Sequence, residues 1–248
     1  MGSRCSIPRH LIFILFCVII LYLIIKINED AEVKQIIIAD DSFNDRYYKV
    51  ATVDTLNDIV VNNSETKVHL AIFMESQCPD TSHYIHKSLM EAWNKLGSTG
   101  RVILDIVPFG KARCESINGD YKCECQHGEE ECKNNILMNC VMYHIKDPIT
   151  YVPFVNCIQG KDTYDIAFDL CIKNKNGALE KTLKTCSTTK EGRQLLAIAG
   201  RKTAALNPGI NFVPWVMIDG KREIDAYYAL EENLCNRLSP KPEQCIHK

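Results

Sequence analysis

Cysteine is frequent in this chain and unevenly placed. Two of the 13 cysteines lie near the start, at positions 5 and 17, and the other eleven follow from Cys78 onward. In a chain that enters an oxidising compartment, this density predicts a disulfide framework. Eleven is an odd number, so at least one cysteine stays unpaired or pairs with another molecule. We expect Cys78 to be that one, and the disulfide candidates are Cys114, Cys123, Cys125, Cys132, Cys140, Cys157, Cys171, Cys186, Cys235 and Cys245.

A zinc site is an alternative use for some of these cysteines. Cys123, Cys125, His127 and Cys132 carry thiolate and imidazole groups, which are standard zinc ligands. Their first pair is spaced C-x-C, however, and not C-x-x-C as in the usual zinc knuckle. Because secretory proteins use cysteine chiefly in disulfides, we expect no metal here.

An apolar segment near the N-terminus is the reason to expect an oxidising compartment. Residues 11–27 (LIFILFCVIILYLIIKI) contain one cation. A helix of this length spans about 25 Å, at about 1.5 Å per residue, which is near the lower limit for crossing a bilayer. Arg4 and Arg9 precede the segment and Glu29 follows it. The positive-inside rule therefore places residues 1–10 in the cytosol and the rest in the lumen or outside. The segment is either a retained type II anchor or a cleaved signal peptide, and the bulky residues at its end favour the anchor.

Beyond this membrane segment the chain divides into two parts. Residues 28–66 are polar and irregular and predict a stalk or leader, with a glycosylation sequon at Asn62. Residues 67–248 have a length that suits one domain. The net charge of −2 gives no reason to expect a nucleic-acid partner or electrostatic adhesion to a membrane surface.

The start of this domain has the pattern of a strand, a helix and a second strand. Residues 68–74 (VHLAIFM) form an apolar run of strand length. From Pro79 to Gly97 apolar residues recur at helical spacing. Residues 102–107 (VILDIV) form a second strand. A strand–helix–strand unit of this length predicts two parallel strands.

The rest of the domain is a long helical stretch followed by a hairpin and a helix. Residues 129–206 predict mostly helix, and residues 212–224 (FVPWVMIDGKREI) predict two strands joined at an Asp219-Gly220 turn. A closing helix then carries an apolar stripe at Ala226, Leu230, Leu234 and Leu238. This order of elements predicts an α/β, thioredoxin-like fold with a helical insertion.

Cys78 lies at the junction between the first strand and its helix. With Pro79 at the first helical position, Cys78 becomes the N-cap residue, and we expect its sulfur to face the unpaired amides of Asp80 and Thr81. Those amides and the helix dipole stabilise a thiolate, the reactive form of cysteine. Asp80 opposes this with its negative charge, although its carboxylate can turn toward water. A lone cysteine in such a place is as often structural as reactive.

A longer motif elsewhere in the chain favours the interpretation of Cys78 as a reactive cysteine. Residues 125–140 read CQHGEEECKNNILMNC, which has the spacing C-Q-H-G-x-x-E-C-x-x-N-x-x-x-x-C. This resembles the signature of the gamma-interferon-inducible lysosomal thiol reductase (GILT) family. The stretches MESQCPDT, VPFG and NFVPWVMIDG are similar to family segments as well, so the resemblance runs from about residue 68 to residue 245. The fixed signature positions are Cys125, Gln126, His127, Gly128, Glu131, Cys132, Asn135 and Cys140.

The resemblance implies a fold, an activity and a location. GILT-like proteins have a thioredoxin-like fold, are lysosomal or secreted, and reduce protein disulfides at acidic pH without a cofactor. Cys78 corresponds to their nucleophile, and Pro214 resembles the cis-proline that lies opposite the nucleophile in thioredoxin-like folds. The signature cysteines then look structural, and we expect His127 to pack or form hydrogen bonds rather than serve as a catalytic base.

One position departs from the family pattern. The usual active site is C-x-x-C, whereas this chain has Cys78-Pro79-Asp80-Thr81. In the dithiol mechanism the second thiol resolves the mixed disulfide that the first one forms. A threonine hydroxyl cannot attack sulfur in this way, although it can donate a hydrogen bond to the Cys78 thiolate. Completion therefore needs an external thiol, such as glutathione or cysteine, or a thiol of the substrate.

Three interpretations follow from this departure. The first is a thiol–disulfide oxidoreductase, a monothiol reductase or isomerase that acts on disulfide-containing proteins through Cys78. The second is a catalytically impaired protein that binds protein partners, with Cys78 trapping them covalently. The third is a disulfide-stabilised scaffold, which requires Cys78 to be buried or paired.

Overall fold

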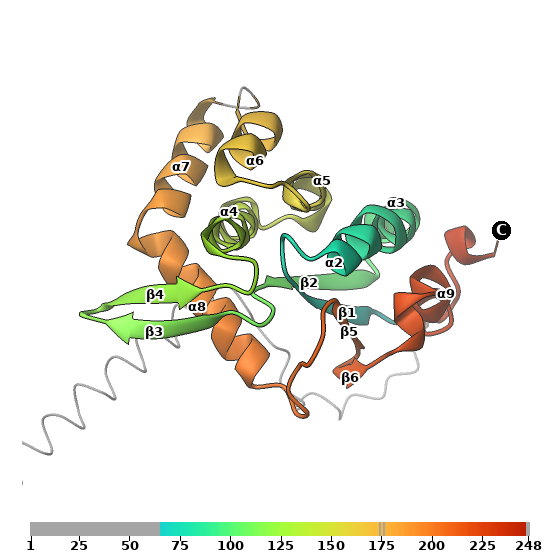
Figure 1. Cartoon of the computed structure of the whole chain (residues 1–248). Coiled ribbons are helices and arrows are strands. Elements are labelled where there is room, and N and C mark those ends of the chain that lie inside the picture. Colours follow the sequence, from blue (N-terminus) through green and yellow to red (C-terminus); the bar gives the residue numbers. More distant parts are fainter. Residues whose placement is uncertain (1–64, 174, 176, 247–248) are drawn as a thin grey trace, which may run out of the picture. The chain divides into compact units, whose positions relative to one another are not determined.

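A computed structural model describes residues 65–173, 175 and 177–246 (Figure 1). The predicted cytosolic N-terminus, the membrane segment 11–27, nearly all of the predicted stalk and the Asn62 sequon lie outside these residues. Within the described part of the chain, no helix is both long enough and apolar enough to cross a bilayer.

The central sheet has four strands in the order β2-β1-β5-β6. The strands are β1 (Val68–Met74), β2 (Val102–Pro108), β5 (Trp215–Ile218) and β6 (Lys221–Arg222). Strands β1 and β2 run parallel with Val68 opposite Val102, as the strand–helix–strand pattern predicts. Strand β5 pairs antiparallel with the other side of β1, and β6 pairs antiparallel with β5. This mixed sheet is the thioredoxin-like core that the sequence predicts.

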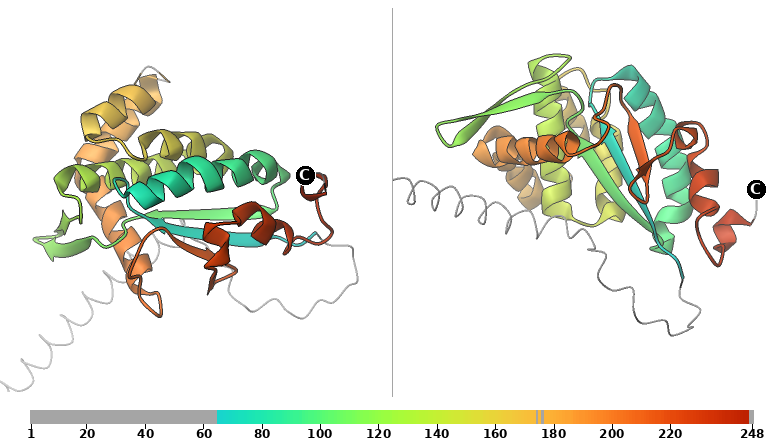
Figure 2. Two further views of the ribbon diagram at one scale, coloured as in Figure 1. Left: turned by 45° about the vertical axis from the view of Figure 1, so that its right-hand side comes forward. Right: turned by 90° about the horizontal axis from the view of Figure 1, so that it is seen from below.

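Strands β1 and β2 are apolar because most of their side chains are buried. In β1 and β2 the last three residues are all buried, and alternation appears only at the start of each strand. Helices α2 (Pro79–Tyr84), α3 (Met90–Leu96), α4 (Glu129–Ile145) and α5 (Pro148–Ile158) form a layer along one side of these strands (Figure 2). Strand β1 therefore ends inside the protein, and the loop that follows it is held on several sides.

The helix predicted from Pro79 is continuous but not regular. Helix α2 passes into a π-helical turn, Ile85–Leu89, which leads into α3 and ends in a 3₁₀ turn at Gly97–Thr99. Gly100 then takes the left-handed conformation that stops the helix. The spacing of apolar residues does not reveal the π turn, because one extra residue per turn still leaves Ile85 and Leu89 on the buried side.

A second, two-stranded sheet was not predicted. Strands β3 (Arg113–Ile117) and β4 (Asp120–Glu124) form an antiparallel hairpin. Their side chains are largely exposed, so the alternation that marks a half-buried strand is missing. The signal was the Asn118-Gly119 pair, whose residues have φ of 51° and 74°, the conformation that a two-residue hairpin turn requires.

The predicted helical insertion is present and is held by disulfides. It comprises α4, α5, α6 (Tyr164–Cys171), α7 (Gly177–Thr188) and α8 (Lys190–Ala204). The ten candidate cysteines form five disulfides in the described chain: Cys114–Cys123, Cys125–Cys132, Cys140–Cys186, Cys157–Cys171 and Cys235–Cys245. Because Cys123, Cys125 and Cys132 are all oxidised, the alternative zinc site has no thiolate ligands.

The C-terminal elements are shorter than the pattern suggests. The Asp219-Gly220 turn has φ of 50° and 73° and joins β5 to β6, as predicted, but β6 has only two residues. The single closing helix is instead a 3₁₀ turn, Asp225–Tyr227, followed by α9 (Leu230–Cys235). All four residues of the predicted apolar stripe are nonetheless buried, namely Ala226, Leu230, Leu234 and Leu238.

Candidate active site

Cys78 lies between β1 and α2, at the N-cap of the helix that begins with Pro79. It is the only free cysteine among the described residues, and its side chain is partly exposed. The backbone of Cys78 is extended, with φ of −71° and ψ of 125°, and its carbonyl accepts the amide of Ser82 at 2.9 Å. The interpretation as a scaffold required a buried or paired Cys78, and the structure has neither.

The sulfur does not contact the amides that the sequence pattern suggested. The Cys78 side chain makes no capping hydrogen bond to α2. Its nearest polar partner is the carbonyl oxygen of Val213, 3.9 Å away on the segment that precedes β5. The Val213–Pro214 peptide bond is cis, as the resemblance implied, and Pro214 is buried opposite the nucleophile. An extended N-cap backbone is also compatible with capping, so the orientation of the Cys78 side chain, toward the Val213 carbonyl, is what keeps the sulfur from the helix amides.

Thr81 occupies the position of a resolving cysteine, one turn into α2. Its side chain is fully buried and its hydroxyl has no hydrogen-bond partner in the described structure. The hydrogen bond that a threonine here could donate to Cys78 is therefore not formed among the described residues. Thr81 is buried, whereas the partly exposed Cys78 places its sulfur near the Val213 carbonyl. Leaving a buried hydroxyl unpaired costs about 1–3 kcal/mol, so the Thr81 hydroxyl lowers the stability of the fold.

The loop between β1 and Cys78 is fixed by hydrogen bonds from two parts of the helical insertion. From α4, Asn135 Oδ1 accepts the amide of Ser76 at 3.0 Å, and the Ser76 hydroxyl donates to the Glu131 carbonyl at 3.1 Å. From the end of α5, Gln159 Nε2 donates to the Glu75 carbonyl at 3.0 Å. The Gly160 amide donates to the Ser76 carbonyl at 2.8 Å. These contacts fix the position of the nucleophile.

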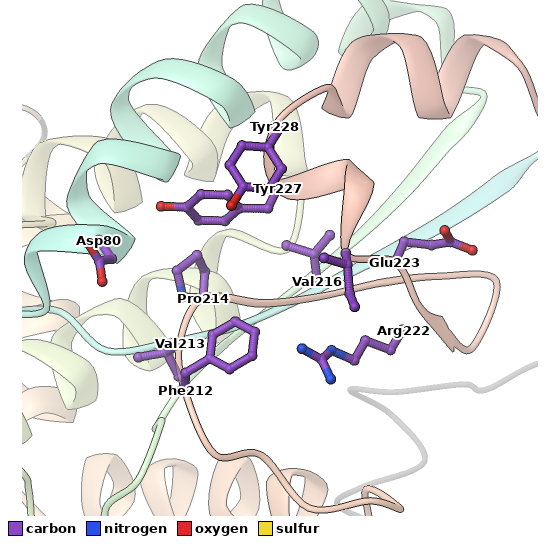
Figure 3. Close-up of a pocket in the computed structure, with 10 residues that line it drawn as sticks. Asp80, Phe212, Val213, Pro214, Val216, Arg222, Glu223, Tyr227 and Tyr228 are labelled. Carbon is purple, nitrogen blue, oxygen red and sulfur yellow. The ribbon is translucent and has the colours of Figure 1, made fainter.

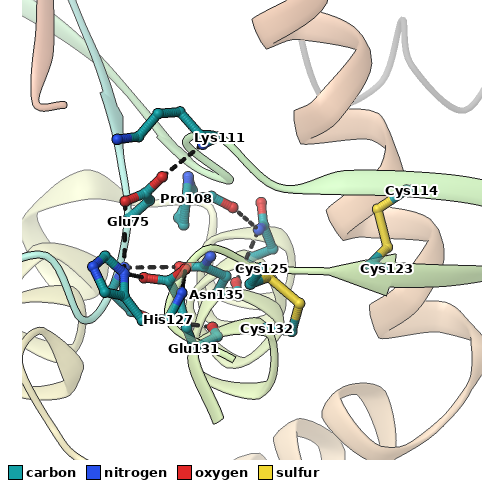
Figure 4. Close-up of a disulfide and its surroundings, with 12 residues drawn as sticks. Glu75, Pro108, Lys111, Cys114, Cys123, Cys125, His127, Glu131, Cys132 and Asn135 are labelled. Atoms are coloured by element: carbon teal, nitrogen blue, oxygen red, sulfur yellow. Dashed lines mark hydrogen bonds and ion pairs between the residues drawn. A yellow bond between two sulfur atoms is a disulfide. The ribbon is translucent and has the colours of Figure 1, made fainter. Parts of the chain in front are cut away.

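The carboxylate of Glu75, from this loop, forms a cluster with the Glu131 carboxylate and the His127 ring (Figure 4). Glu75 and Glu131 are fully buried, while the His127 side chain is 32% exposed. His127 Nδ1 lies 2.5 Å from Glu131 Oε2 and 3.8 Å from Glu75 Oε2. Glu75 Oε1 accepts the Lys111 amide at 2.7 Å, but Glu75 Oε2 has no hydrogen-bond partner in the described structure. Burial raises the pKa of the Glu75 carboxyl above its ordinary value, the Lys111 amide opposes this, and the Glu131 charge adds to the rise.

This cluster has the donor types of a metal site, but most of its ligand atoms already take part in hydrogen bonds within the protein. Glu75, His127 and Glu131 offer three ligand atoms within 4.8 Å of one another. Glu131 accepts both the amide of His127 at 3.1 Å and its ring nitrogen. The pair thus closes the start of α4 as a capping interaction, and we assign no metal to it. His127 acts as the hydrogen-bonding residue that the sequence analysis expected.

The signature residues outside this cluster shape the start of α4. Gly128 has φ of 96° at the N-cap, a conformation that favours glycine, and Cys125–Cys132 closes the loop around it. Cys140 ties α4 to α7 through Cys186. Gln126 is exposed, and nothing in the structure explains its place in the signature. The motif therefore marks a structural support for the Cys78 loop, which its spacing alone could not show.

The raised pKa of Glu75 predicts a pH-dependent stability. Because the folded protein favours the neutral carboxyl, the unfolded chain releases this proton first as pH rises. Stability is therefore highest below the ordinary pKa of glutamate and falls as pH rises toward the raised value, by at most about 1.4 kcal/mol per pH unit. Glu75→Gln, which is neutral at every pH, should remove this loss, as urea unfolding from pH 4 to pH 8 would show.

Glu130→Gln is the matched control for this prediction. The Glu130 carboxylate accepts hydrogen bonds from Lys133 and from the Tyr164 amide, and these lower its pKa. The ionised Glu130 carboxylate stabilises the folded protein above the ordinary pKa of glutamate, and this stabilisation is lost as pH falls through the lowered pKa. Glu130→Gln should therefore change the stability profile on its acidic side instead. Identical pH profiles for Glu75→Gln and the unmodified protein would contradict the assignment of Glu75.

The fold, with a free and partly exposed cysteine at a strand–helix junction near a cis-proline, defines the chain as a thioredoxin-like protein. Among solved structures, BdbD from Bacillus subtilis has a similar fold, with a TM-score of 0.51 and 14% sequence identity. That similarity covers 70% of this chain and 91% of the bacterial one. At this identity it is evidence for the fold alone.

Sequence comparison narrows the class to a family. The profile described as gamma interferon inducible lysosomal thiol reductase (GILT) matches residues 69–175. A GILT-like protein of Caenorhabditis elegans is 44% identical over 181 residues, which cover 73% of this chain and 56% of that protein. A GILT-like protein of Caenorhabditis briggsae is 35% identical, over 77% of this chain and 88% of its own length. The mouse gamma-interferon-inducible lysosomal thiol reductase is 24% identical, over 73% of this chain and 77% of its length. The chain belongs to the GILT family.

Proposed function

We propose that this protein is a monothiol reductase or isomerase that acts on protein disulfides in the secretory pathway. The observation that carries the proposal is the state of Cys78, a free and partly exposed thiol at the strand–helix junction, beside a cis-proline. Family membership supports the same chemistry. Thr81, buried and unable to act as a thiol, gives the reaction its single-cysteine form.

The reaction then proceeds in three exchanges. The Cys78 thiolate attacks one sulfur of a substrate disulfide, so that a Cys78–substrate disulfide forms, the substrate S–S bond breaks, and the departing sulfur takes a proton from solvent. A small thiol such as glutathione or cysteine then attacks the Cys78 sulfur and releases the second substrate thiol. A second small thiol frees Cys78. One substrate disulfide is reduced to two thiols, and two small thiols are oxidised to one disulfide. If a substrate thiol attacks instead, the disulfide is rearranged without net reduction.

The location follows from features outside the described residues. The apolar segment 11–27 and the sequon at Asn62 support a type II membrane protein or a secreted protein, with the catalytic domain in a lysosome or outside the cell. Five disulfides in the described domain support the same oxidising compartment.

Turnover of a disulfide-linked reporter peptide by the full-length protein, at several concentrations of glutathione, tests this proposal. The rate should exceed that of glutathione alone and rise in proportion to it, and a Cys78–peptide adduct should accumulate when glutathione is left out. An adduct that glutathione does not release would favour a protein that traps its partners. The absence of both adduct and turnover would overturn the proposed activity.

A further inference from the structure

A pocket begins beside the nucleophile and extends toward the edge of the sheet (Figure 3). Its volume is about 240 Å³. Val213 and Pro214 line the end nearest Cys78, whose sulfur contacts the Val213 carbonyl. Asp80, two residues beyond the nucleophile, and Arg222, on β6, both line it, and Figure 3 places them on opposite sides of Pro214. A polypeptide attached to Cys78 through a disulfide has this pocket directly beside it.

The walls of the pocket are apolar and unusually exposed. Phe212 is 42% exposed, Ile224 is 60% exposed and Tyr228 is 80% exposed. These three residues come from two separate segments on either side of β5 and β6, and they line one pocket. Single exposed apolar residues are common on protein surfaces, but a cluster beside a reactive group indicates a binding site. Its size suits one bulky side chain with part of its backbone.

The charges of the pocket differ at its two ends. The central carbon of the Arg222 guanidinium lies over the Trp215 ring, 3.9 Å from its centroid, and over the Phe212 ring, 4.9 Å from its centroid. No carboxylate in the described structure pairs with it, because the neighbouring Glu223 pairs with Arg237 at 2.8 Å. A guanidinium placed over aromatic rings can still donate its N–H groups to a carboxylate. Asp80, at the other end, is exposed and close to the nucleophile.

We propose that this pocket selects the protein substrate. The occupant is an extended segment with a bulky apolar side chain next to its disulfide cysteine, and with an aspartate or glutamate farther along that pairs with Arg222. The inference rests on the proposed function, since it names the substrate class of that reaction. A free small thiol such as cysteine has no side chain to fill the apolar walls, so the pocket does not serve the reductant.

Disulfide-linked peptides that differ only at these two positions test the inference. One peptide carries leucine beside its cysteine and glutamate farther on, and its counterparts carry glycine for the leucine or lysine for the glutamate. The rate of adduct formation with the full-length protein should be about tenfold higher with leucine than with glycine, which is typical of filling a partly enclosed apolar site. It should be several-fold higher with glutamate than with lysine at low salt.

Variants of the pocket residues test whether the peptide preferences arise from this pocket. Arg222→Glu should reverse the charge preference, so that the lysine peptide reacts faster, while Lys221→Glu makes the same charge change outside the pocket and should leave the preference intact. Phe212→Ala should remove most of the preference for leucine. The rate with a small uncharged disulfide, 2-hydroxyethyl disulfide, is measured in each variant, and each peptide rate is divided by it so that selectivity is separated from the intrinsic reactivity of Cys78.

The outcomes separate this inference from the proposed function. If the unmodified protein reacts with the small disulfide but shows no preference among the peptides, the pocket is not a selectivity site. If Arg222→Glu weakens all peptides equally, the pairing with a substrate carboxylate is wrong. If neither the small disulfide nor any of the peptides reacts with Cys78, the proposed function itself fails.

Discussion

Cys78→Ser is expected to abolish disulfide exchange, with a loss of at least about a thousandfold in rate, since a hydroxyl cannot replace the thiolate in this reaction. The substitution should leave the fold intact. The Cys78 sulfur has a single long polar contact, to Val213, and the residue is partly exposed. We expect the free energy of unfolding to change by no more than about 0.5 kcal/mol. Reporter turnover and urea unfolding, measured on the same preparation, give both values.

The hairpin disulfide provides the matched control. Removing Cys114 and Cys123 together deletes a disulfide from the exposed β3–β4 hairpin. Turnover should persist in that double variant, because these sulfurs lie in a separate sheet from the site. Retained turnover in Cys78→Ser would contradict the assignment of Cys78 as the nucleophile. Loss of turnover only in the hairpin variant would show that the Cys114–Cys123 disulfide carries out the exchange.

Thr81→Cys is expected to convert the single-cysteine reaction into a two-cysteine one. The new thiol replaces a buried hydroxyl that has no hydrogen-bond partner, so the substitution should not destabilise the domain. An intramolecular thiol acts at an effective concentration of roughly 1 mM or more. At about 10 µM external thiol, release of substrate from the Cys78 adduct should therefore be about a hundredfold faster. Quenched-flow measurement of adduct lifetime, followed by mass spectrometry, reports this directly.

Thr81→Val separates the effect of the thiol from the effect of removing the hydroxyl. Valine has nearly the shape of threonine and satisfies the same apolar surroundings, but it supplies no sulfur. Its adduct should last as long as that of the unmodified protein. An equally long adduct lifetime in Thr81→Cys would show that the missing resolving thiol is not what limits this protein.

The sequence was sufficient for the parts of the fold that have a strong pattern. Continuous apolar runs gave β1 and β2, and the Asp219-Gly220 pair marked the turn between β5 and β6. The odd number of cysteines after the membrane segment identified a leftover thiol, and the structure leaves Cys78 unpaired. These features depend on local spacing, on turn conformation or on parity, all of which a single sequence contains.

The environment of the site could not be predicted because it depends on contacts between distant segments. Gly110 has φ of 61°, and a side chain there would collide with Glu75. Nothing near either residue in the sequence shows this contact. Asn135 holds Ser76 from 59 residues away, so the role of the signature appears only in three dimensions. The contact between the Cys78 sulfur and the Val213 carbonyl likewise joins residues 135 positions apart, so the C-x-x-T spacing could not reveal it.

Peptide mapping of the native full-length protein after alkylation tests the central claim most directly. With iodoacetamide at neutral pH and no reductant, Cys78 should carry the label, and the ten cysteines from Cys114 to Cys245 should be recovered as the five disulfides described above. A peptide in which Cys78 is bonded to another cysteine of the same chain, or an unlabelled Cys78 thiol, would contradict the account of a single available nucleophile.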